Sequence, residues 1–436
     1  MNRRRSLGIA ALSRDTALLV ASRVAAQLAA VGLTVLLAGR LGLVGFGEFA
    51  FVSALVFVAN VVTTFGTDMV LIRDVAGLGR MDRCAPAFAL QIALSLAVIT
   101  VIWLATAVLP PGHGEIVLSL RIMSLSLLPS ALFSVCTAAL RGRGALRAYA
   151  AITVGAAATP LLAVAVLAAP GVSVVRAVTL LLVAQGVIAA VAWATSAARV
   201  PDAPVISRTS AAEVMALARA SASIGVLGLL GVAYQRCGAL AVAIAAGPAA
   251  TGWFAGASRV VEASKTGHVA LFTAVYPAMA EAHADGRSNR LALRWSWRMS
   301  VAAGALVSAT LLLAGPWLID RLYGAAFASA KPGLAILALT IVPSTVATYQ
   351  SLALLAADRA RDTLRVLASS LAILLVSTVL LVPTVGWIGA CWAALIADSA
   401  NAALMLAARA HSARRPAPAQ HHAGLTTAAK AGGRSA

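Results

Sequence analysis

About twelve apolar stretches, each close to 20 residues long, follow one another along this 436-residue chain. A helix of about 20 residues is long enough to cross the hydrocarbon core of a bilayer, which is ~30 Å thick. The stretches do not alternate between apolar and polar residues, so they lack the pattern of membrane-barrel strands. We therefore expect an all-α polytopic membrane protein with spans at about residues 17–38, 46–66, 86–109, 117–140, 150–168, 177–197, 220–245, 250–275, 298–319, 333–356, 364–382 and 386–408.

The composition excludes a soluble globular protein. Hydrophobic residues make up 61% of the chain and charged residues only 11%, whereas a soluble domain carries about 25% charged residues. The four cysteines are far apart in the sequence and none forms a CxxC pair. We therefore predict neither a disulfide framework nor a metal site, and no cofactor.

The basic residues predict the orientation of the spans. The net charge is +19, which in a soluble protein would suggest a nucleic-acid partner. Here, placing the N-terminus inside puts 25 of the 34 Lys and Arg residues in cytoplasmic segments and four in external loops. Because cytoplasmic loops are enriched in Lys and Arg, we expect both termini in the cytoplasm and no nucleic-acid partner.

The loops divide the chain into two halves of six spans each. A cytoplasmic N-terminus at 1–16 precedes an N-lobe at 17–197, and a Pro- and Ser-containing cytoplasmic linker at 198–219 leads to a C-lobe at 220–410. Residues 411–436 are rich in Ala, Pro and Gly, so we expect a disordered cytoplasmic tail.

A weak internal repeat relates the two halves. Because six is an even number, both halves enter the membrane in the same sense, and a pseudo-twofold axis along the membrane normal would relate them. Two such lobes enclose a central cavity, which indicates a transporter. The matching positions, all at a separation of 205 residues (247 − 42 = 205), are Gly42, Gly47, Phe49 and Ala50 in the first half and Gly247, Gly252, Phe254 and Ala255 in the second.

Several charged residues fall inside the expected spans. A basic side chain at a helix centre costs about 2.5–3.5 kcal/mol on insertion scales, so it persists mainly where it faces a bundle interior or a water-filled cavity. Glu262 lies between Arg259 and Lys265 at three-residue steps, on one helix face. The candidate substrate-binding residues are Arg23, Gln27, Arg121, Arg236, Arg259 and Lys265, and Glu262 and Asp398 are candidates for ion coupling or for pairing with these cations.

The five basic residues outnumber the two deep acids, so a surplus of positive charge is expected within the membrane. A cavity with this surplus attracts anions, and the planar fork of arginine matches phosphate oxygens. A lipid-linked pyrophosphate or an acidic sugar would fit, and a cationic drug would not. The sequence has no P-loop, HExxH or GxSxG motif, and no large outer loop with paired carboxylates, so we do not expect an enzyme.

Six segments carry a resemblance to a known family. They are 41–50 (LGLVGFGEFA), 65–68 (FGTD), 71–74 (LIRD), 257–262 (ASRVVE), 272–278 (FTAVYPA) and 322–327 (LYGAAF). These segments resemble bacterial lipid-linked oligosaccharide flippases of the polysaccharide-biosynthesis family. At 236–238 the chain has RCG where members of that family often have RID, so an acid is missing there.

The resemblance implies a MATE-like fold within the multidrug, oligosaccharidyl-lipid and polysaccharide flippase superfamily. It further implies a location in the bacterial inner membrane, and alternating access to a cationic cavity that moves an undecaprenyl-pyrophosphate-linked oligosaccharide across that membrane for surface polysaccharide synthesis. The expected partners are a lipid-linked anionic oligosaccharide, membrane lipids and other membrane proteins of polysaccharide assembly.

Two alternatives remain open. A cation-coupled multidrug exporter of the MATE type would need acids in the N-lobe cavity, and in spans one to six we find none deeper than Glu48. A membrane-embedded polymerase or glycosyltransferase is the third hypothesis.

Overall fold

The computed structural model describes the backbone of residues 2–108, 114–202, 205–284, 290–356 and 359–413. Side chains are described for the same residues except 2–16, 266–284, 290–294, 356, 360, 412 and 413. All regular elements in these ranges are helices, since only a helix satisfies every backbone polar group of an isolated segment in lipid. They are α1 (Asn2–Thr64), α2 (Thr67–Leu78), η1 (Met81–Arg83), α3 (Cys84–Ala107), α4 (Gly114–Ser124), α5 (Leu127–Gly142), α6 (Leu146–Leu167), α7 (Val174–Arg199), α8 (Ala211–Ala284), α9 (Arg290–Tyr323), η2 (Ala325–Ala330), α10 (Lys331–Leu339), α11 (Ile341–Ala356), α12 (Ala360–Val385) and α13 (Trp387–Ala413).

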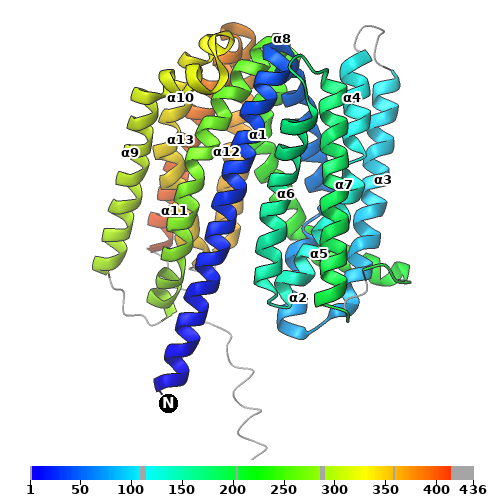
Figure 1. The fold of residues 1–436 in the computed structure, drawn as a ribbon. Helices are drawn as coiled ribbons and strands as arrows, with labels where there is room; N and C mark the ends of the chain where they lie inside the picture. The colour runs from blue at the N-terminus through cyan, green and yellow to red at the C-terminus, as the bar shows by residue number, and fades with distance from the viewer. Residues whose placement is uncertain (1, 109–113, 203–204, 285–289, 357–358, 414–436) are drawn as a thin grey trace, which may run out of the picture.

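Helices α1 and α8 each consist of two helices joined at a glycine. Gly42 has φ 70° and ψ −179°, and Gly247 has φ 80° and ψ −179°. This backbone region is open essentially only to glycine, and the chain turns back there, at the upper end of Figure 1. The apolar part of α1, Ala17–Thr64, has 48 residues and would be ~72 Å long as a straight helix, more than twice the bilayer core. Each of the two long helices therefore accounts for two crossings.

The number of crossings agrees with the sequence prediction. The described residues contain ten apolar segments long enough to span a bilayer, and two of them, within α1 and α8, are divided by the glycine kinks. This makes twelve crossings. The paired glycines of the internal repeat take the same backbone conformation at the same place in each half, so they confirm the repeat.

The two halves of the chain form two lobes. In Figure 1, α3 to α7 lie on one side of α1, and α9, α10, α11 and α13 lie on the other. The glycine kinks lie at one end of the bundle, the kink end, and α1 begins at the opposite end, the linker end. The N-lobe contains α1 to α7 and the C-lobe α8 to α13.

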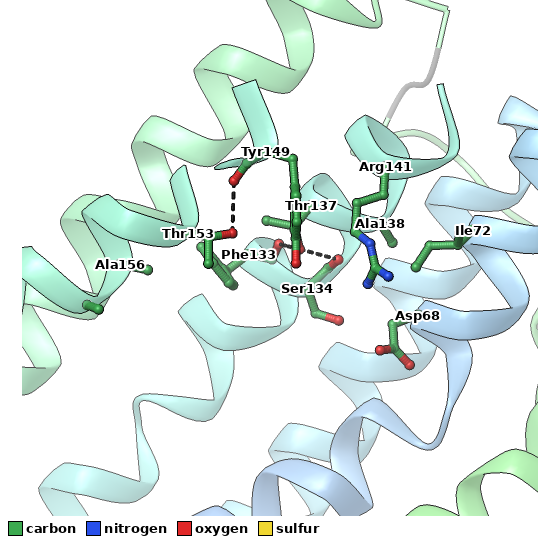
Figure 2. A pocket seen from close by; sticks show the side chains of 11 residues that line it. Asp68, Ile72, Phe133, Ser134, Thr137, Ala138, Arg141, Tyr149, Thr153 and Ala156 are labelled. Atoms are coloured by element: carbon green, nitrogen blue, oxygen red, sulfur yellow. Dashed lines mark hydrogen bonds between the residues drawn. The ribbon is translucent and has the colours of Figure 1, made fainter. Parts of the chain in front are cut away.

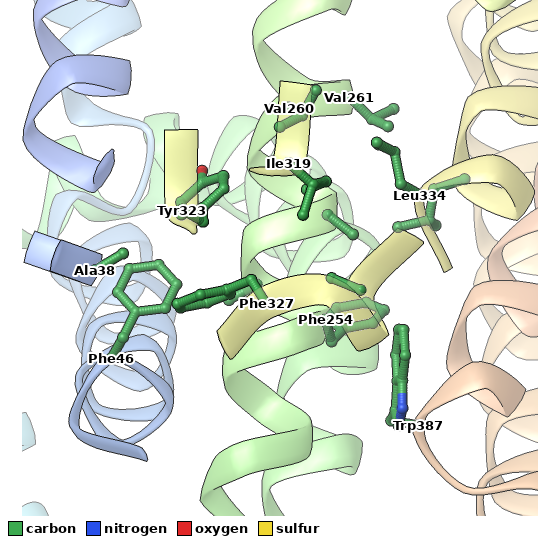
Figure 3. Close-up of a cluster of buried hydrophobic side chains, with 14 of the residues drawn as sticks. Ala38, Phe46, Phe254, Val260, Val261, Ile319, Tyr323, Phe327, Leu334 and Trp387 are labelled. Carbon is green, nitrogen blue, oxygen red and sulfur yellow. The ribbon is translucent and has the colours of Figure 1, made fainter. Parts of the chain in front are cut away.

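An aromatic cluster packs the lobes together at the kink end (Figure 3). Phe46 of α1 is 2% exposed and lies against Tyr323 and Phe327 of the C-lobe, with ring centroids 6.3 and 5.8 Å away. Close by, Gly47 and Gly252 bring the α1 and α8 backbones into contact, so that a Cβ on Gly252 would lie 2.6 Å from the carbonyl oxygen of Leu43. We call the contact between Gly47 and Gly252 the kink-end seal.

A second glycine contact joins the two lobes at the linker end. A Cβ on Gly66 would lie 2.7 Å from the backbone nitrogen of Gly225, and a Cβ on Gly225 would lie 2.9 Å from the carbonyl oxygen of Phe65. We call this contact between Gly66 and Gly225 the linker-end seal. The lobes therefore meet closely at both ends.

The segments between and beyond the lobes differ slightly from the expected boundaries. Helix α8 begins at Ala211, within the range expected for the linker, and its start is capped by two reciprocal bonds. The backbone N–H of Ser210 donates to Glu213 Oε2 (2.8 Å), and the backbone N–H of Glu213 donates to Ser210 Oγ (3.3 Å), the arrangement of a capping box. Helix α13 continues to Ala413, and the rest of the expected tail lies outside the described residues.

Candidate functional site

A cavity of about 290 Å³ lies between the two lobes. Its N-lobe wall comes from α1, α4, α5 and the residue before α5, and its C-lobe wall consists of two arginines of α8. Because α8 turns back at Gly247, Arg236, 11 residues before it, and Arg259, 12 residues after it, come together. Eleven residues of helix span ~16 Å, which is about half the bilayer core. The lining residues are Ser53, Val56, Phe57, Asn60, Met123, Ser126, Leu127, Ser130, Arg236 and Arg259.

Arg236 is held by a ring and a carboxylate. Its guanidinium carbon lies 4.7 Å from the centre of the Phe57 ring, and its Nη1 lies 3.3 Å from Glu262 Oε1. A cation over an aromatic face is attracted by the ring quadrupole. The side chain is 13% exposed, so this cation is largely removed from the surface.

Arg259 shares the same carboxylate. Its Nη1 lies 3.0 Å from Glu262 Oε2, one helical turn away, and its side chain is 37% exposed. Two guanidinium groups and one carboxylate together carry one net positive charge. In addition, the Nε of Arg236 is buried and has no hydrogen-bond partner among the described residues. A buried donor without an acceptor costs about 1–3 kcal/mol, which favours a ligand that brings oxygen atoms to this cavity.

The other expected charges of the C-lobe form a separate group. Lys265 Nζ lies 3.5 Å from Asp398 Oδ2, and the hydroxyl of Tyr234 donates a hydrogen bond to Asp398 Oδ1 at 2.7 Å. This group joins α8 to α13. Lys265 therefore shares a helix with Arg259 and Glu262 but pairs with an acid on another helix, and it does not line the cavity.

Three further residues expected at the site do not line the cavity. Arg23 is exposed and Gln27 is half-buried, and neither lines the cavity. The Nε of Arg121 donates a hydrogen bond to Thr106 Oγ1 at 2.9 Å, which ties α4 to α3 within the N-lobe. Their role as substrate-binding residues remains a prediction.

A second cavity, of about 340 Å³, lies inside the N-lobe between α2, α5 and α6 (Figure 2). Asp68 and Arg141 line it, and the Arg141 guanidinium carbon lies 5.2 Å from the centre of the Tyr149 ring. Asp68 is the second residue of α2, which lies between two membrane-spanning segments, and α2 brings it to the cavity wall. The expectation that spans one to six hold no acid deeper than Glu48 stays a prediction. The FGTD segment contained this residue, but hydropathy alone did not show that its side chain faces inward.

A buried carboxylate organises the turn between α2 and α3 at the linker end. Asp74, whose side chain is 3% exposed, accepts from Arg73 Nε and from Arg83 Nη1, each at 3.0 Å. The Arg73–Asp74 pair of the family-like LIRD segment is therefore a structural element of this turn. Among the described residues, no cluster of three or more His, Cys, Asp or Glu residues could hold a metal ion.

Twelve membrane crossings in two repeated lobes, with a cavity lined by polar and apolar residues between them, define a polytopic membrane protein of the MATE-like fold. The sequence profile of the family described as "Polysaccharide biosynthesis protein" matches residues 36–332, which is more than half of the chain. The chain belongs to this family. No curated protein matches the sequence.

Solved structures with the same fold include both drug transporters and a lipid flippase. An inward-facing multidrug resistance MATE family transporter superposes with a TM-score of 0.70 at 14% identity, over 89% of this chain and 94% of that one. The lipid II flippase MurJ in an inward closed conformation gives 0.71 at 11% identity, over 90% and 87%. A MOP superfamily transporter from Pyrococcus furiosus, described as having a binding pocket of reverse polarity, gives 0.63 at 14% identity, over 92% and 95%.

Proposed function

We propose that the protein moves an anionic, undecaprenyl-pyrophosphate-linked oligosaccharide across the bacterial inner membrane by alternating access, as a step in surface polysaccharide synthesis. The observation that supports this most is the pair Arg236 and Arg259 on one wall of the cavity between the lobes, sharing the carboxylate of Glu262. Family membership and the fold shared with a lipid II flippase agree with it.

The chemistry of the two arginines suits a pyrophosphate. A guanidinium group donates two parallel hydrogen bonds to phosphate oxygens, and it keeps its charge when it is buried. In this proposal the headgroup enters the cavity while the lipid tail remains in the bilayer. The linker end faces the cytoplasm, because 25 of the 34 Lys and Arg residues lie in the segments assigned to that side. Both termini are then cytoplasmic, and other polysaccharide-assembly proteins remain candidate partners.

The remaining charged candidates have secondary roles in this proposal. Arg23, exposed on α1, and Lys265, on α8, would contact the headgroup or acidic sugars when the lobes separate. Gln27 and Arg121 are proposed along the same route. Glu262 and Asp398 act as counter-ions of the empty state, and they are the candidates for ion coupling.

The test replaces Arg236 by alanine in the producing strain. We expect the loss of surface polymer with unchanged amounts of the protein in the membrane, because the buried cation is removed. Arg321→Ala, which changes an exposed arginine at the kink end, is the matched control and should leave the polymer at the wild-type level. Full polymer in the Arg236→Ala strain would contradict the proposal.

A MATE-type exporter of organic cations is the second candidate function. The observation that favours it is Asp68, a carboxylate on the wall of the N-lobe cavity, together with the fold shared with multidrug transporters. Expression in a strain without drug pumps separates the two functions. Resistance to organic cations that is lost in Asp68→Asn would support the exporter.

A further inference from the structure

The two walls of the cavity between the lobes differ in hydrogen-bonding character. The C-lobe wall consists of Arg236 and Arg259, whose guanidinium groups only donate. The N-lobe wall contributes four polar side chains, Ser53, Asn60, Ser126 and Ser130.

Three of these four side chains present acceptors. The hydroxyl of Ser53 donates to the carbonyl of Ala50 at 3.0 Å, and the hydroxyl of Ser126 donates to the carbonyl of Met123 at 2.7 Å. Each proton is used within its own helix, so each oxygen keeps its lone pairs for another donor. The Oδ1 of Asn60 is buried and has no partner among the described residues.

A bare phosphate or pyrophosphate leaves these three acceptors of the N-lobe wall without a donor. Its oxygens accept hydrogen bonds from arginine, but an ionised phosphate offers no proton to a serine or asparagine oxygen. An acceptor left buried without a donor costs about 1–3 kcal/mol. The ligand that satisfies both walls has an anion on one side and hydroxyl or amide N–H groups on the other.

We propose that the N-lobe wall binds the sugar attached directly to the pyrophosphate, and that Asn60 is the specificity-determining residue which accepts from a hydroxyl or amide of that sugar. This inference rests on the proposed function and adds the part of the substrate that each lobe recognises. A cavity of about 290 Å³ is at the small end of ligand pockets, so it takes the headgroup and its first sugar and leaves the rest of the glycan outside. The site thus distinguishes a loaded lipid carrier from an empty one.

The test compares two lipids that differ only in the sugar. The purified full-length protein is titrated with farnesyl pyrophosphate and with farnesyl-pyrophosphoryl-N-acetylglucosamine, and the ratio of the two dissociation constants is measured. We expect the wild type to prefer the sugar-bearing lipid, and Asn60→Leu to reduce this preference about tenfold, as the loss of one hydrogen bond with its buried partner left unpaired implies. Binding of the sugar-free lipid should stay within about twofold of the wild type.

Asn401→Leu is the matched control, because Asn401 also has a buried Oδ1 without a partner among the described residues but does not line this cavity. It should leave the preference unchanged. If Asn60→Leu weakens the binding of both lipids equally, or of neither, the inference is wrong. This holds even if Arg236→Gln weakens the binding of both lipids. If Arg236→Gln weakens neither lipid, the proposed function itself fails.

Discussion

Substituting Gly252 by alanine should open the protein at the kink end. Gly252 of α8 packs against the backbone of α1 at Leu43 in the kink-end seal, and a Cβ there would lie 2.6 Å from the Leu43 carbonyl oxygen. Carbon and oxygen atoms pack favourably at about 3.3–3.6 Å. The helices must therefore separate by ~0.7 Å or more, and backbone atoms cannot rotate out of the way as a flexible side chain can.

The expected size follows from the cost of overpacking. Extra methyl groups in a tightly packed contact cost about 1–3 kcal/mol, and this cost falls only on the state in which the kink-end seal is closed. A change of about 1–3 kcal/mol shifts a two-state equilibrium about 5- to 150-fold. The fraction of molecules open at the kink end should rise by a factor in this range.

The assay measures access to the cavity from each end. A single cysteine replaces Ser126, which lines the cavity, in a variant without the four native cysteines. A membrane-impermeant maleimide is then applied to the kink-end side or to the linker-end side of sealed vesicles. Gly252→Ala should accelerate labelling from the kink end only. Gly225→Ala, whose Cβ would lie 2.9 Å from the Phe65 carbonyl oxygen in the linker-end seal, should accelerate labelling from the linker end only.

Gly231→Ala is the control for both variants, because it lies on α8 and a Cβ there meets nothing within 4 Å. It should label at the wild-type rate. If Gly252→Ala and Gly225→Ala label like Gly231→Ala, or if both accelerate labelling from the same side, the glycine contacts do not close the two ends of the cavity.

Three further predictions follow from the ion pairs and the aromatic cluster. Glu262→Gln removes the anion shared by the two arginines, so the ligand no longer competes with it. The substitution should tighten binding of farnesyl pyrophosphate by up to about fivefold, since exposed ion pairs contribute about 0.2–1 kcal/mol. Weaker binding in a titration would contradict competition between Glu262 and the ligand. Lys265→Met and Asp398→Asn should show a coupling of about 0.5–3 kcal/mol in a double-mutant cycle of thermal unfolding, and strictly additive effects would show that their 3.5 Å contact does not stabilise the fold. Phe46→Ala should lower the free energy of unfolding by about 3 kcal/mol, because its packing on two aromatic rings is lost. The control Val44→Ala, at a side chain 53% exposed, should change the free energy of unfolding little. Equal losses in both variants would refute the role of the aromatic cluster.

Hydropathy and loop charge predicted most of the fold. Apolar length determines whether a segment spans a bilayer. The linker divides the spans into six and six, which predicted two lobes that enter the membrane in the same sense. The repeat of Gly42 and Gly247 predicted a shared turn, and the structure shows why glycine stands there, because both residues adopt a backbone conformation with positive φ that other residues avoid.

Candidate site residues were harder to predict, because sequence position gives depth in the membrane but not which way a side chain points. Arg236 and Arg259 meet at the cavity because α8 turns back on itself. Arg23 also falls inside an expected span but is exposed on α1, and Arg121 is bonded to Thr106 on a neighbouring helix. Asp68 was missed because it follows a glycine turn at the end of an apolar run, where acids are normally solvated.

Transport by the purified protein is the most direct test of the central claim, that the cavity accepts an anionic lipid headgroup. Proteoliposomes containing the wild type or Arg236→Ala receive a fluorescent farnesyl-pyrophosphoryl sugar in one leaflet, and its arrival in the other leaflet is followed by quenching. The account predicts rapid transfer by the wild type and only the protein-free background rate with Arg236→Ala. Transfer at equal rates by both proteins, or transport of an organic cation by a wild type that does not move the lipid, would contradict it.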